Sequence, residues 1–351
     1  MRIKIDNIEV EAEDGITILD AARLAGIEIP TLCHKDGVEP YSSCMVCMVR
    51  DKAKNTFLPS CSALAHNGME IDASGEEVLG LRRKAVSLLL SEHRAECEAR
   101  CRAVCPAGYN IPLMNRLLLA GEYDEAAELI RSEVGDGELN CISCKAFCEN
   151  ACLRKKIDNA VSIRNIRIFI SKNMPAVRKY EVSPHYSGKN IRNRYSSRTG
   201  PLDEKELAEW TRECKDYPVR HMDISGYDMA SEEAAACMHC DCRASSDCQL
   251  RALVDKFGLK DPKVKFINAP ISKKISRTTG LIFENAKCIK CGLCVRIVAD
   301  STENPALCFI NRGFVSLLSE PLIAEFDDIT ASVAEKCVEV CPTGALAFLK
   351  N

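Results

Sequence analysis

The stretch TILDAARLAGIEIPTLCHKDGVEPYSSCMVCMVR, residues 17–50, decides the fold of the N-terminal part of the chain. Its beginning has helical spacing, so we expect a short helix over residues 17–25, which Gly26 ends. Upstream, apolar and polar residues alternate, and the alternation breaks at Asp6–Asn7, which indicates a strand hairpin. We therefore expect residues 1–75 to form strands around one short helix.

The second half of this stretch carries three members of a four-cysteine set. The set has the spacing C-x10-C-x2-C-x13-C and consists of Cys33, Cys44, Cys47 and Cys61. A [2Fe–2S] cluster needs four thiolates, commonly three from one loop and one from a distant segment. Small residues around Cys44 allow backbone amides to approach the sulfides of such a cluster. A four-cysteine zinc site is the alternative, but zinc loops rarely have a first gap of ten residues.

The same stretch resembles the N-terminal ferredoxin domain of the complex I large subunit, NAD-linked formate dehydrogenases and iron-only hydrogenases. The resemblance is carried by the whole of residues 17–50, including the YSSCMVC loop. It implies a β-grasp [2Fe–2S] ferredoxin domain over residues 1–75. The ligands that it implies are the four cysteines of this first set.

The composition indicates an intracellular metal-binding chain. It has 351 residues and 22 cysteines, and only 5% of its residues are aromatic, so small modules stabilised by metals are expected. The N-terminus lacks the build of a secretory signal, and no apolar run reaches the roughly 18 residues of a membrane helix. We therefore expect a cytoplasmic chain without a membrane span, whose clustered cysteines bind metal rather than form disulfides. The formal net charge of −3 argues against nucleic acid as a partner.

Residues 76–175 are expected to form a helical domain. Ser74 and Glu77 have the spacing of a capping box, and apolar residues follow at helical intervals. Further along, Pro112 marks a helix start, and Gly121 separates that helix from a second one.

Seven cysteines lie in this helical region, in two runs whose short gaps place successive thiols on one helix face. With CPAGYNIPLMNRLLLAGEYDEAAELI between them, the two runs resemble the α-helical double-cluster ferredoxin domain of the glutamate synthase small subunit. Dihydropyrimidine dehydrogenase begins with the same kind of domain. The resemblance implies two [4Fe–4S] clusters. One is bound by Cys97, Cys101 and Cys152, and the other by Cys105, Cys141, Cys144 and Cys148.

Seven cysteines do not supply the eight ligands of two clusters. His93 lies one helical turn before Cys97, and imidazole can replace thiolate as an iron ligand. The LLLSEH context of this histidine also resembles the His-ligated cluster of the complex I family. We therefore expect His93 to complete the set of Cys97, Cys101 and Cys152. The alternative is a histidine on the helix surface and an open or different fourth position.

Residues 176–230 are polar and rich in Arg, Ser, Lys and Tyr, which indicates a linker or a strap that wraps a partner. A four-cysteine metal module over residues 231–260 follows. Its cysteines are Cys237, Cys240, Cys242 and Cys248. We expect a [4Fe–4S] cluster here because the neighbouring modules carry clusters. Zinc is the alternative, because tetrahedral thiolate sites accept varied spacings.

The C-terminal residues 261–351 alternate like a small α+β module and contain CIKCGLC and VCPTGAL, the two halves of a bacterial ferredoxin motif. One ligand set is complete and consists of Cys288, Cys291, Cys294 and Cys341. The second is broken, since Val298, Ala331 and Ala334 occupy ligand positions. We expect one [4Fe–4S] cluster and one lost cluster in a ferredoxin-like domain. The remaining cysteines, which are Cys214, Cys308 and Cys337, are expected to be small buried hydrophobes.

The motifs indicate no catalytic site. No G-x-G-x-x-G follows a strand and no G-x-x-x-x-G-K-[ST] occurs, and we find neither a nucleophile–base pair nor a flavin signature. The sequence therefore predicts an α+β multi-domain chain with one [2Fe–2S] cluster, three to four [4Fe–4S] clusters and no cofactor-binding site besides the metals.

Several clusters in one chain are typical of an electron relay. We expect a non-catalytic electron-transfer subunit of a cytoplasmic, anaerobic oxidoreductase complex. Its expected partners are an NAD(P)H-oxidising flavoprotein subunit and ferredoxin or a further redox subunit, and the complex is a candidate for electron bifurcation. The alternatives are an iron–sulfur redox sensor, for which the sequence offers no output domain, and a structural scaffold subunit.

Overall fold

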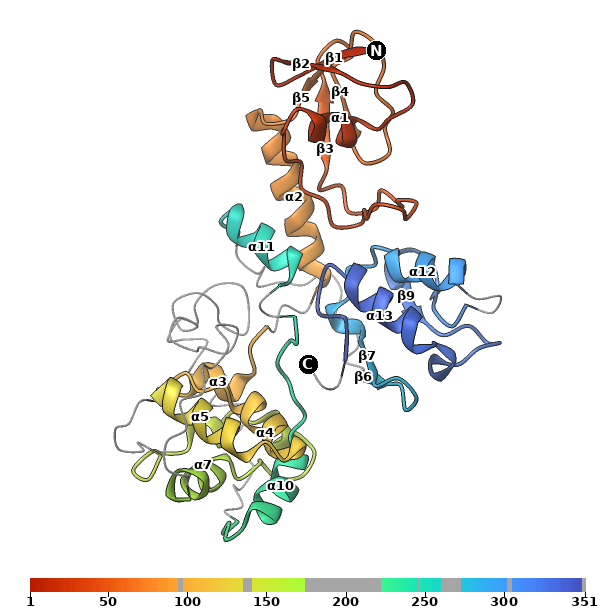
Figure 1. The fold of residues 1–351 in the computed structure, drawn as a ribbon. Coiled ribbons are helices and arrows are strands. Elements are labelled where there is room, and N and C mark those ends of the chain that lie inside the picture. Colours follow the sequence, from red (N-terminus) through yellow and green to blue (C-terminus); the bar gives the residue numbers. More distant parts are fainter. Residues whose placement is uncertain are drawn as a thin grey trace. The chain divides into compact units, whose positions relative to one another are not determined.

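The computed structural model describes residues 1–93, 97–134, 141–173, 222–244, 247–259, 273–301 and 305–348. This part of the chain contains both helices and sheets (Figure 1), which agrees with the expected mixed fold class. It divides into two compact units. Unit 1 combines Met1–Ala95 with Asp247–Asn351, and unit 2 is Glu96–Ser246. Most of the predicted linker, residues 176–230, lies outside the described residues.

A five-stranded sheet forms the N-terminal part of unit 1. Its strands are β1 (Arg2–Ile5), β2 (Ile8–Glu11), β3 (Met48–Asp51), β4 (Thr56–Pro59) and β5 (Glu70–Asp72). The order is β2-β1-β5-β3-β4, in which β1 and β5 run parallel and the other neighbours antiparallel. The predicted hairpin is confirmed. Asp6 and Asn7 both have positive φ (47° and 70°), as a tight two-residue hairpin turn requires.

Helix α1 (Ile18–Leu24) packs against this sheet (Figure 1). Thr17 caps its N-terminus by accepting a hydrogen bond from the N–H of Asp20 at 3.1 Å. Gly26, with φ of 71°, follows its C-terminus. The helix therefore lies where the sequence predicts it. Helix and sheet share one apolar core, which includes Ile3, Ile5, Leu19 and Ile71.

Helix α2 (Glu76–Glu92) begins differently from the prediction. Ser74 and Glu77 form no capping box, because Gly75 is the N-cap residue and no side chain caps the helix. The carboxylate of Asp72 instead accepts hydrogen bonds from the backbone N–H of Ser74 at 3.3 Å and from that of Gly75 at 2.7 Å. A Cβ on Gly75 would overlap this carboxylate. The capping-box prediction is wrong because the turn before the helix is built around Asp72.

The C-terminal part of unit 1 is a small module of strands and helices. Strands β10 (Leu346–Phe348), β7 (Leu281–Glu284) and β6 (Lys273–Ile275) form one antiparallel sheet in that order, and β8 (Cys308–Ile310) pairs with β9 (Leu317–Ser319). The helices are α12 (Leu293–Ser301) and α13 (Ala331–Val340), with 3-10 turns η3 (Asn285–Lys287), η4 (Gly313–Val315) and η5 (Phe326–Asp328).

Apolar packing occupies two of the three positions of the lost ligands in this module, whereas the third, Ala331, is exposed. Val298 and Ala334 are buried in its core, and so is Cys337, which behaves as the buried hydrophobe that we predict. Of the other leftover cysteines, Cys308 is only half-buried, and Cys214 lies outside the described residues.

A shared core joins the two parts of unit 1. Helix α11 (Gln249–Lys256) packs against α2. The core around them includes Leu32, Cys33 and Cys44 from the N-terminal loops, Val86 and Leu90 from α2, Leu250 and Val254 from α11, and Cys291 and Val340 from the C-terminal module. Unit 1 is therefore complete only when both of its chain segments are present.

One aromatic side chain strengthens this junction. Tyr41 lies against the backbone of Gly292, whose φ is 81°, and a Cβ on Gly292 would overlap the tyrosine ring. The guanidinium of Arg296 lies 4.3 Å from the ring centroid and pairs with Glu39 at 3.2 Å. Phe309 meets the same ring edge-on, with centroids 6.3 Å apart. These contacts attach the N-terminal loop to the CIKCGLC loop.

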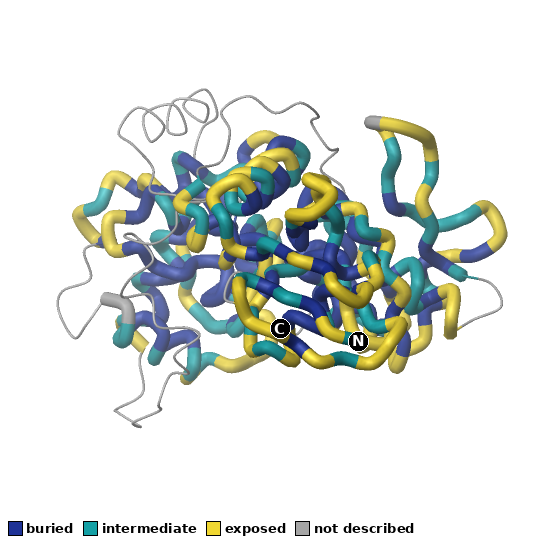
Figure 2. Tube along the Cα trace, turned by 90° about the horizontal axis from the view of Figure 1, so that it is seen from above, coloured by how far each residue is buried: buried dark blue, intermediate teal, exposed yellow. Residues whose placement is uncertain are grey.

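Unit 2 is built from short helices (Figure 1). They are α3 (Arg100–Val104), α4 (Ile111–Ala120), α5 (Tyr123–Val134), α6 (Phe147–Asn150), η1 (Leu153–Lys156), α7 (Ile163–Lys172) and α10 (Tyr227–Ala235). Pro112 lies in the first turn of α4, and Gly121, with φ of 77°, ends this helix, as predicted. Figure 2 colours the described residues by burial, and buried and exposed residues alternate along the chain.

Helix α10 belongs to this core although it lies far downstream in the sequence. It packs against α4 and α7, and its Ala230 and Ala234 are completely buried. Ser231 donates its hydroxyl to the carbonyl oxygen of Leu118 at 3.0 Å. The backbone N–H of Ser162 donates to Glu233 Oε1 at 2.8 Å.

The contact between Tyr41 and Gly292 predicts a difference between two glycines. Both Gly292 and Gly313 have positive φ, but a Cβ on Gly313 would meet open space. Gly313→Ala should cost about 1 kcal/mol from backbone strain alone. Gly292→Ala should cost more, about 1–3 kcal/mol, because it also displaces the tyrosine ring. The measurement is the urea midpoint of each variant.

The Tyr41→Ala background provides the control for this pair. Without the ring, the two glycine substitutions should shift the urea midpoint by similar amounts, as a double-mutant cycle would show. Equal effects already in the natural background would contradict the contact.

Candidate metal centres

The four cysteines of the first set lie in one site. The Sγ atoms of Cys33 and Cys44 are 3.2 Å apart, and the Cys44 thiol lowers the pKa of Cys33 to about 6. The Cys61 thiol likewise lowers the pKa of Cys47 to about 7. In return, hydrogen bonding to Cys33 and burial raise the pKa of Cys44. Hydrogen bonding to Cys47 and burial likewise raise the pKa of Cys61. The structure therefore brings together two close pairs of thiols. These are four thiols in total, the number of ligands that a [2Fe–2S] cluster needs.

Hydrogen-bond donors surround these sulfurs. The backbone N–H of Cys44 donates to Cys33 Sγ at 3.4 Å, and the Ser42 hydroxyl lies 3.5 Å from Cys61 Sγ. Ser60 donates both its N–H and its hydroxyl to the carbonyl oxygen of Cys47. Donors to the sulfurs are among the groups that set the potential of an iron–sulfur cluster. Two of these contacts come from the YSSC segment, through Ser42 and the backbone of Cys44.

The four cysteines of the C-terminal set line one cavity of about 20 Å³, and they are Cys288, Cys291, Cys294 and Cys341. The loop turns at Lys290, with φ of 56°, so that its backbone N–H donates to Cys288 Sγ at 3.3 Å. Burial raises the pKa of Cys288 to about 12 and that of Cys294 well above its ordinary value. Thiols that ionise with difficulty in an apolar site fit a cluster, because its iron supplies positive charge.

These two sites are neighbours within unit 1. Cys33, Cys44 and Cys291 are members of one packed core. Burial raises the pKa of Cys291, and the charges of Cys341, Cys288 and Cys33 raise it further. Sequence reasoning missed this proximity, because the two motifs lie in different domains and no local pattern relates them.

The predicted set of Cys105, Cys141, Cys144 and Cys148 also lies together. Burial raises the pKa of Cys148 strongly, and the charges of Glu149, Cys105 and Cys141 raise it further. Burial also raises the pKa of Cys141. The charge of Arg167 opposes this rise, and the charges of Cys105 and Cys144 add to it. Arg164 holds the loop by donating to the carbonyl oxygens of Ile142 at 3.1 Å and Cys144 at 3.4 Å.

A fourth group of thiols combines members of two predicted sets. Cys101, Cys152, Cys237 and Cys240 line a cavity of about 20 Å³ in unit 2. Burial raises the pKa of Cys101 far above its ordinary value, and the other three thiols raise it further. The sequence carries one signal for this arrangement. Ala230 and Ala234 have the spacing of a buried helix face just before Cys237, which marks α10 as a core helix.

The other predicted ligands lie as follows. His93 is buried at the C-cap of α2 in unit 1, whereas Cys97 is buried in unit 2. Cys242, in unit 2, donates its backbone N–H to the carbonyl oxygen of Cys97 at 3.0 Å. Cys248 is the N-cap residue of α11 in unit 1. Ligation by His93, and a [4Fe–4S] or zinc site built from all four cysteines of the third set, stay predictions.

The geometry can be compared with that of a single ion. Within the described ranges, no three or more His, Cys, Asp and Glu side chains converge closely enough to hold one metal ion. Zinc requires such convergence, because its thiolate ligands lie about 2.3 Å from the ion. A [4Fe–4S] core is larger and separates its four thiolates. Within the described ranges, the cavities lined by four thiols lack the close convergence that a lone zinc ion needs.

Two family models match the chain. Residues 1–75 match the 2Fe-2S iron-sulfur cluster binding domain, and residues 88–178 match dihydropyrimidine dehydrogenase domain II, 4Fe-4S cluster. These matches confirm both predicted cluster types. The chain thus contains ferredoxin-type domains of the [2Fe–2S] and [4Fe–4S] kinds.

Relatives of the expected kinds are also found. A Bacillus subtilis protein named as a formate dehydrogenase is 38% identical over 95 residues, which are 27% of this chain and 10% of that protein. A protein of Rhizobium meliloti that is named as part of an NADH-quinone oxidoreductase is 29% identical over 121 residues, 34% of this chain and 14% of that protein. A protein of Solidesulfovibrio fructosivorans that is named as part of an NADP-reducing hydrogenase is 36% identical over 103 residues, 28% of this chain and 17% of that protein.

These relatives confirm the resemblance to complex I, formate dehydrogenase and hydrogenase proteins, although the chain spans less than a fifth of each relative's length. Among solved structures, a chain of the NAD⁺-reducing [NiFe]-hydrogenase in the H2-reduced state aligns with a TM-score of 0.51 and 16% identity. The alignment covers 99% of this chain and 86% of that chain, and it concerns the fold alone. No helix in the described ranges is long and apolar enough to cross a membrane.

The C-terminal cavity predicts opposite effects of replacing two nearby cysteines. Cys341→Ala should remove one [4Fe–4S] cluster and lower the iron content by about four atoms per chain. Cys337→Ala should keep the iron and lower stability by about 1–3 kcal/mol, because Cys337 is packed in the core. Iron and acid-labile sulfide on anaerobically purified protein provide the measurement. Equal iron loss in both variants would contradict the assignment.

Proposed function

We propose that the chain is a non-catalytic electron-relay subunit of a multi-subunit oxidoreductase. The ferredoxin-type domains supply one-electron carriers, and the relatives include proteins named for NADH and NADP chemistry. The single observation that carries the proposal is the proximity of the first and last thiol sites, which share one packed core in unit 1.

This proximity has a direct consequence for electron transfer. Clusters exchange single electrons with little reorganisation, and the rate of transfer falls steeply with the distance between them. Cys33 and Cys291 lie in the same apolar core, so clusters on these two sets would be separated by packed protein rather than by solvent. Tyr41, held between Gly292 and Arg296, fixes the spacing of the two loops.

The proposal assigns a role to each part of the chain. Residues 1–75 form a β-grasp [2Fe–2S] domain, residues 76–175 an α-helical ferredoxin domain, and residues 261–351 a bacterial-type ferredoxin domain with one cluster lost. The first set binds the [2Fe–2S] cluster. Two [4Fe–4S] clusters are bound by the set that contains Cys105 and by the set that contains Cys341.

The partners follow from the lack of a catalytic motif in the sequence. An NAD(P)H-oxidising flavoprotein subunit would split the hydride pair into single electrons, and ferredoxin or another redox subunit would receive them. We place this complex in the cytoplasm. The isolated chain should therefore not oxidise NADH, and rapid NADH oxidation without an added flavoprotein would contradict the proposal.

The shared core predicts a magnetic interaction between the first and last clusters. In the fully reduced protein, the [2Fe–2S] electron paramagnetic resonance signal should relax faster than in Cys291→Ala, which lacks the neighbouring [4Fe–4S] cluster. Cys337→Ala is the matched control and should retain fast relaxation. The measurement is power saturation of the signal at several temperatures. Identical relaxation in Cys291→Ala and in the unchanged protein would remove the support for a relay in unit 1.

A further inference from the structure

We propose that Cys101, Cys152, Cys237 and Cys240 together bind one [4Fe–4S] cluster. This set takes two ligands from the helical domain and two from the C-x2-C segment that follows α10. It differs from both predicted sets to which these cysteines belong. The inference rests on the helical region binding [4Fe–4S] clusters, but it does not depend on the relay function.

The cavity itself is the first observation. Its lining contains these four thiols, together with Asn115, Arg154 and apolar residues such as Ile111, Val161 and Ile163. It has the same volume, about 20 Å³, as the cavity lined by the C-terminal ferredoxin set. That set has the spacing of bacterial [4Fe–4S] ferredoxins. The cavity in unit 2 therefore matches the C-terminal cavity in volume and in the number of thiols that line it.

The C-x2-C segment has the backbone conformation of the ferredoxin loop. In the C-terminal module, Lys290 has φ of 56° and its N–H donates to Cys288 Sγ at 3.3 Å. In unit 2, His239 has φ of 46° and its N–H donates to Cys237 Sγ at 3.4 Å. In both loops the third residue of the C-x2-C segment turns the chain and directs an amide at the first sulfur. Such an amide donates a hydrogen bond to the sulfur of a cluster ligand.

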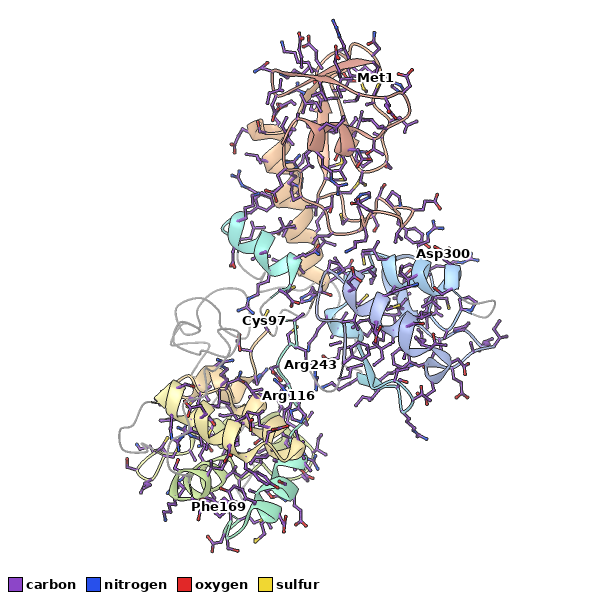
Figure 3. The ribbon with its side chains drawn as sticks, viewed as in Figure 1. Met1, Cys97, Arg116, Phe169, Arg243 and Asp300 are labelled. Atoms are coloured by element: carbon purple, nitrogen blue, oxygen red, sulfur yellow. The ribbon has the colours of Figure 1, made fainter. Side chains whose placement is uncertain are left out.

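Several polar contacts hold this segment against the helices of unit 2. Asp241 receives two hydrogen bonds from Arg116 on α4, at 3.0 and 2.9 Å. Arg154, two residues after Cys152, donates to the carbonyl oxygen of Ala236 at 3.1 Å. Figure 3 shows the labelled Arg116 at one end of unit 2, with Phe169 of α7 at the other. The segment is thereby fixed at the end of unit 2 that carries Arg116.

A buried amide completes the site. Asn115 on α4 is completely buried and lines the cavity, and neither its Nδ2 nor its Oδ1 has a hydrogen-bond partner of good geometry in this structure. An unsatisfied buried amide is costly, so its presence requires an explanation. A cluster in the cavity provides one, because Nδ2–H can donate to a sulfide or thiolate sulfur. The amide and the thiol of Cys237 line the same cavity.

The assignment also answers the shortage of ligands in the helical domain. Cys237 and Cys240 bring the number of thiols around the two helical-domain clusters to eight, so the cluster on Cys101 and Cys152 needs neither His93 nor Cys97. It likewise leaves no complete four-cysteine zinc site in the third set.

The test uses the full chain, purified anaerobically, with five single variants, of which His93→Ala is the second control beside Cys97→Ala. Cys101→Ala, Cys152→Ala and Cys237→Ala should each abolish or alter the same [4Fe–4S] resonance signal and lower iron by up to about four atoms per chain. The matched control Cys97→Ala should keep that signal. The [2Fe–2S] signal in each sample reports whether the rest of the chain is intact.

Three results would overturn the proposal. In the first, Cys97→Ala loses the Cys101-dependent signal while Cys237→Ala retains it. In the second, His93→Ala loses that signal. In the third, Cys237→Ala loses zinc instead of iron. If the helical domain of the Cys237 variant fails to fold, Asn115→Leu provides a second measurement. Loss of the amide should lower the potential of the Cys101-dependent cluster, because the donor favours the reduced, more negative state. An unchanged potential would place the cluster away from this cavity.

Discussion

The central constraint on this molecule is the burial of many sulfur atoms that must ionise in order to bind iron. A thiolate in an apolar site is costly unless positive charge or hydrogen-bond donors compensate it. At Cys288 burial raises the pKa to about 12, and an amide donor from Lys290 offsets part of this effect. Each cluster site therefore needs apolar walls, a tight loop that directs amides at sulfur, and residues that hold the loop in place. The short helices and small sheets of the chain supply these three elements.

Local patterns in the sequence predict the local structure well. The hairpin at Asp6–Asn7, helix α1 and the helix pair around Gly121 all appear as expected, because each depends on neighbouring residues. The capping box at Ser74 fails for the opposite reason. The carboxylate of Asp72 competes for the same backbone N–H groups, and residue spacing alone does not reveal which acceptor wins.

The cluster sites show the same division between local and distant information. Spacing groups Cys288, Cys291 and Cys294, and the structure places them around one cavity because a single loop carries them. Spacing could not place Cys237 beside Cys101, since that arrangement depends on α10 packing against α4. Nor could it reveal that Cys33 and Cys291 share a core. Contacts between distant segments depend on the shape of whole faces, which one sequence does not specify by its motifs.

Unit 1 is discontinuous, since its two segments flank the whole of unit 2 in the sequence. During synthesis on the ribosome, the N-terminal sheet emerges long before α11 and the C-terminal module that complete its core. Until then Leu32, Val86 and Leu90 lack the partners that cover them in the finished protein. Unit 2, a continuous insert, can close first. The nascent chain therefore exposes an apolar surface beside its first iron–sulfur site for much of its elongation, and a chaperone bound to this surface would protect it until residues 247–351 emerge.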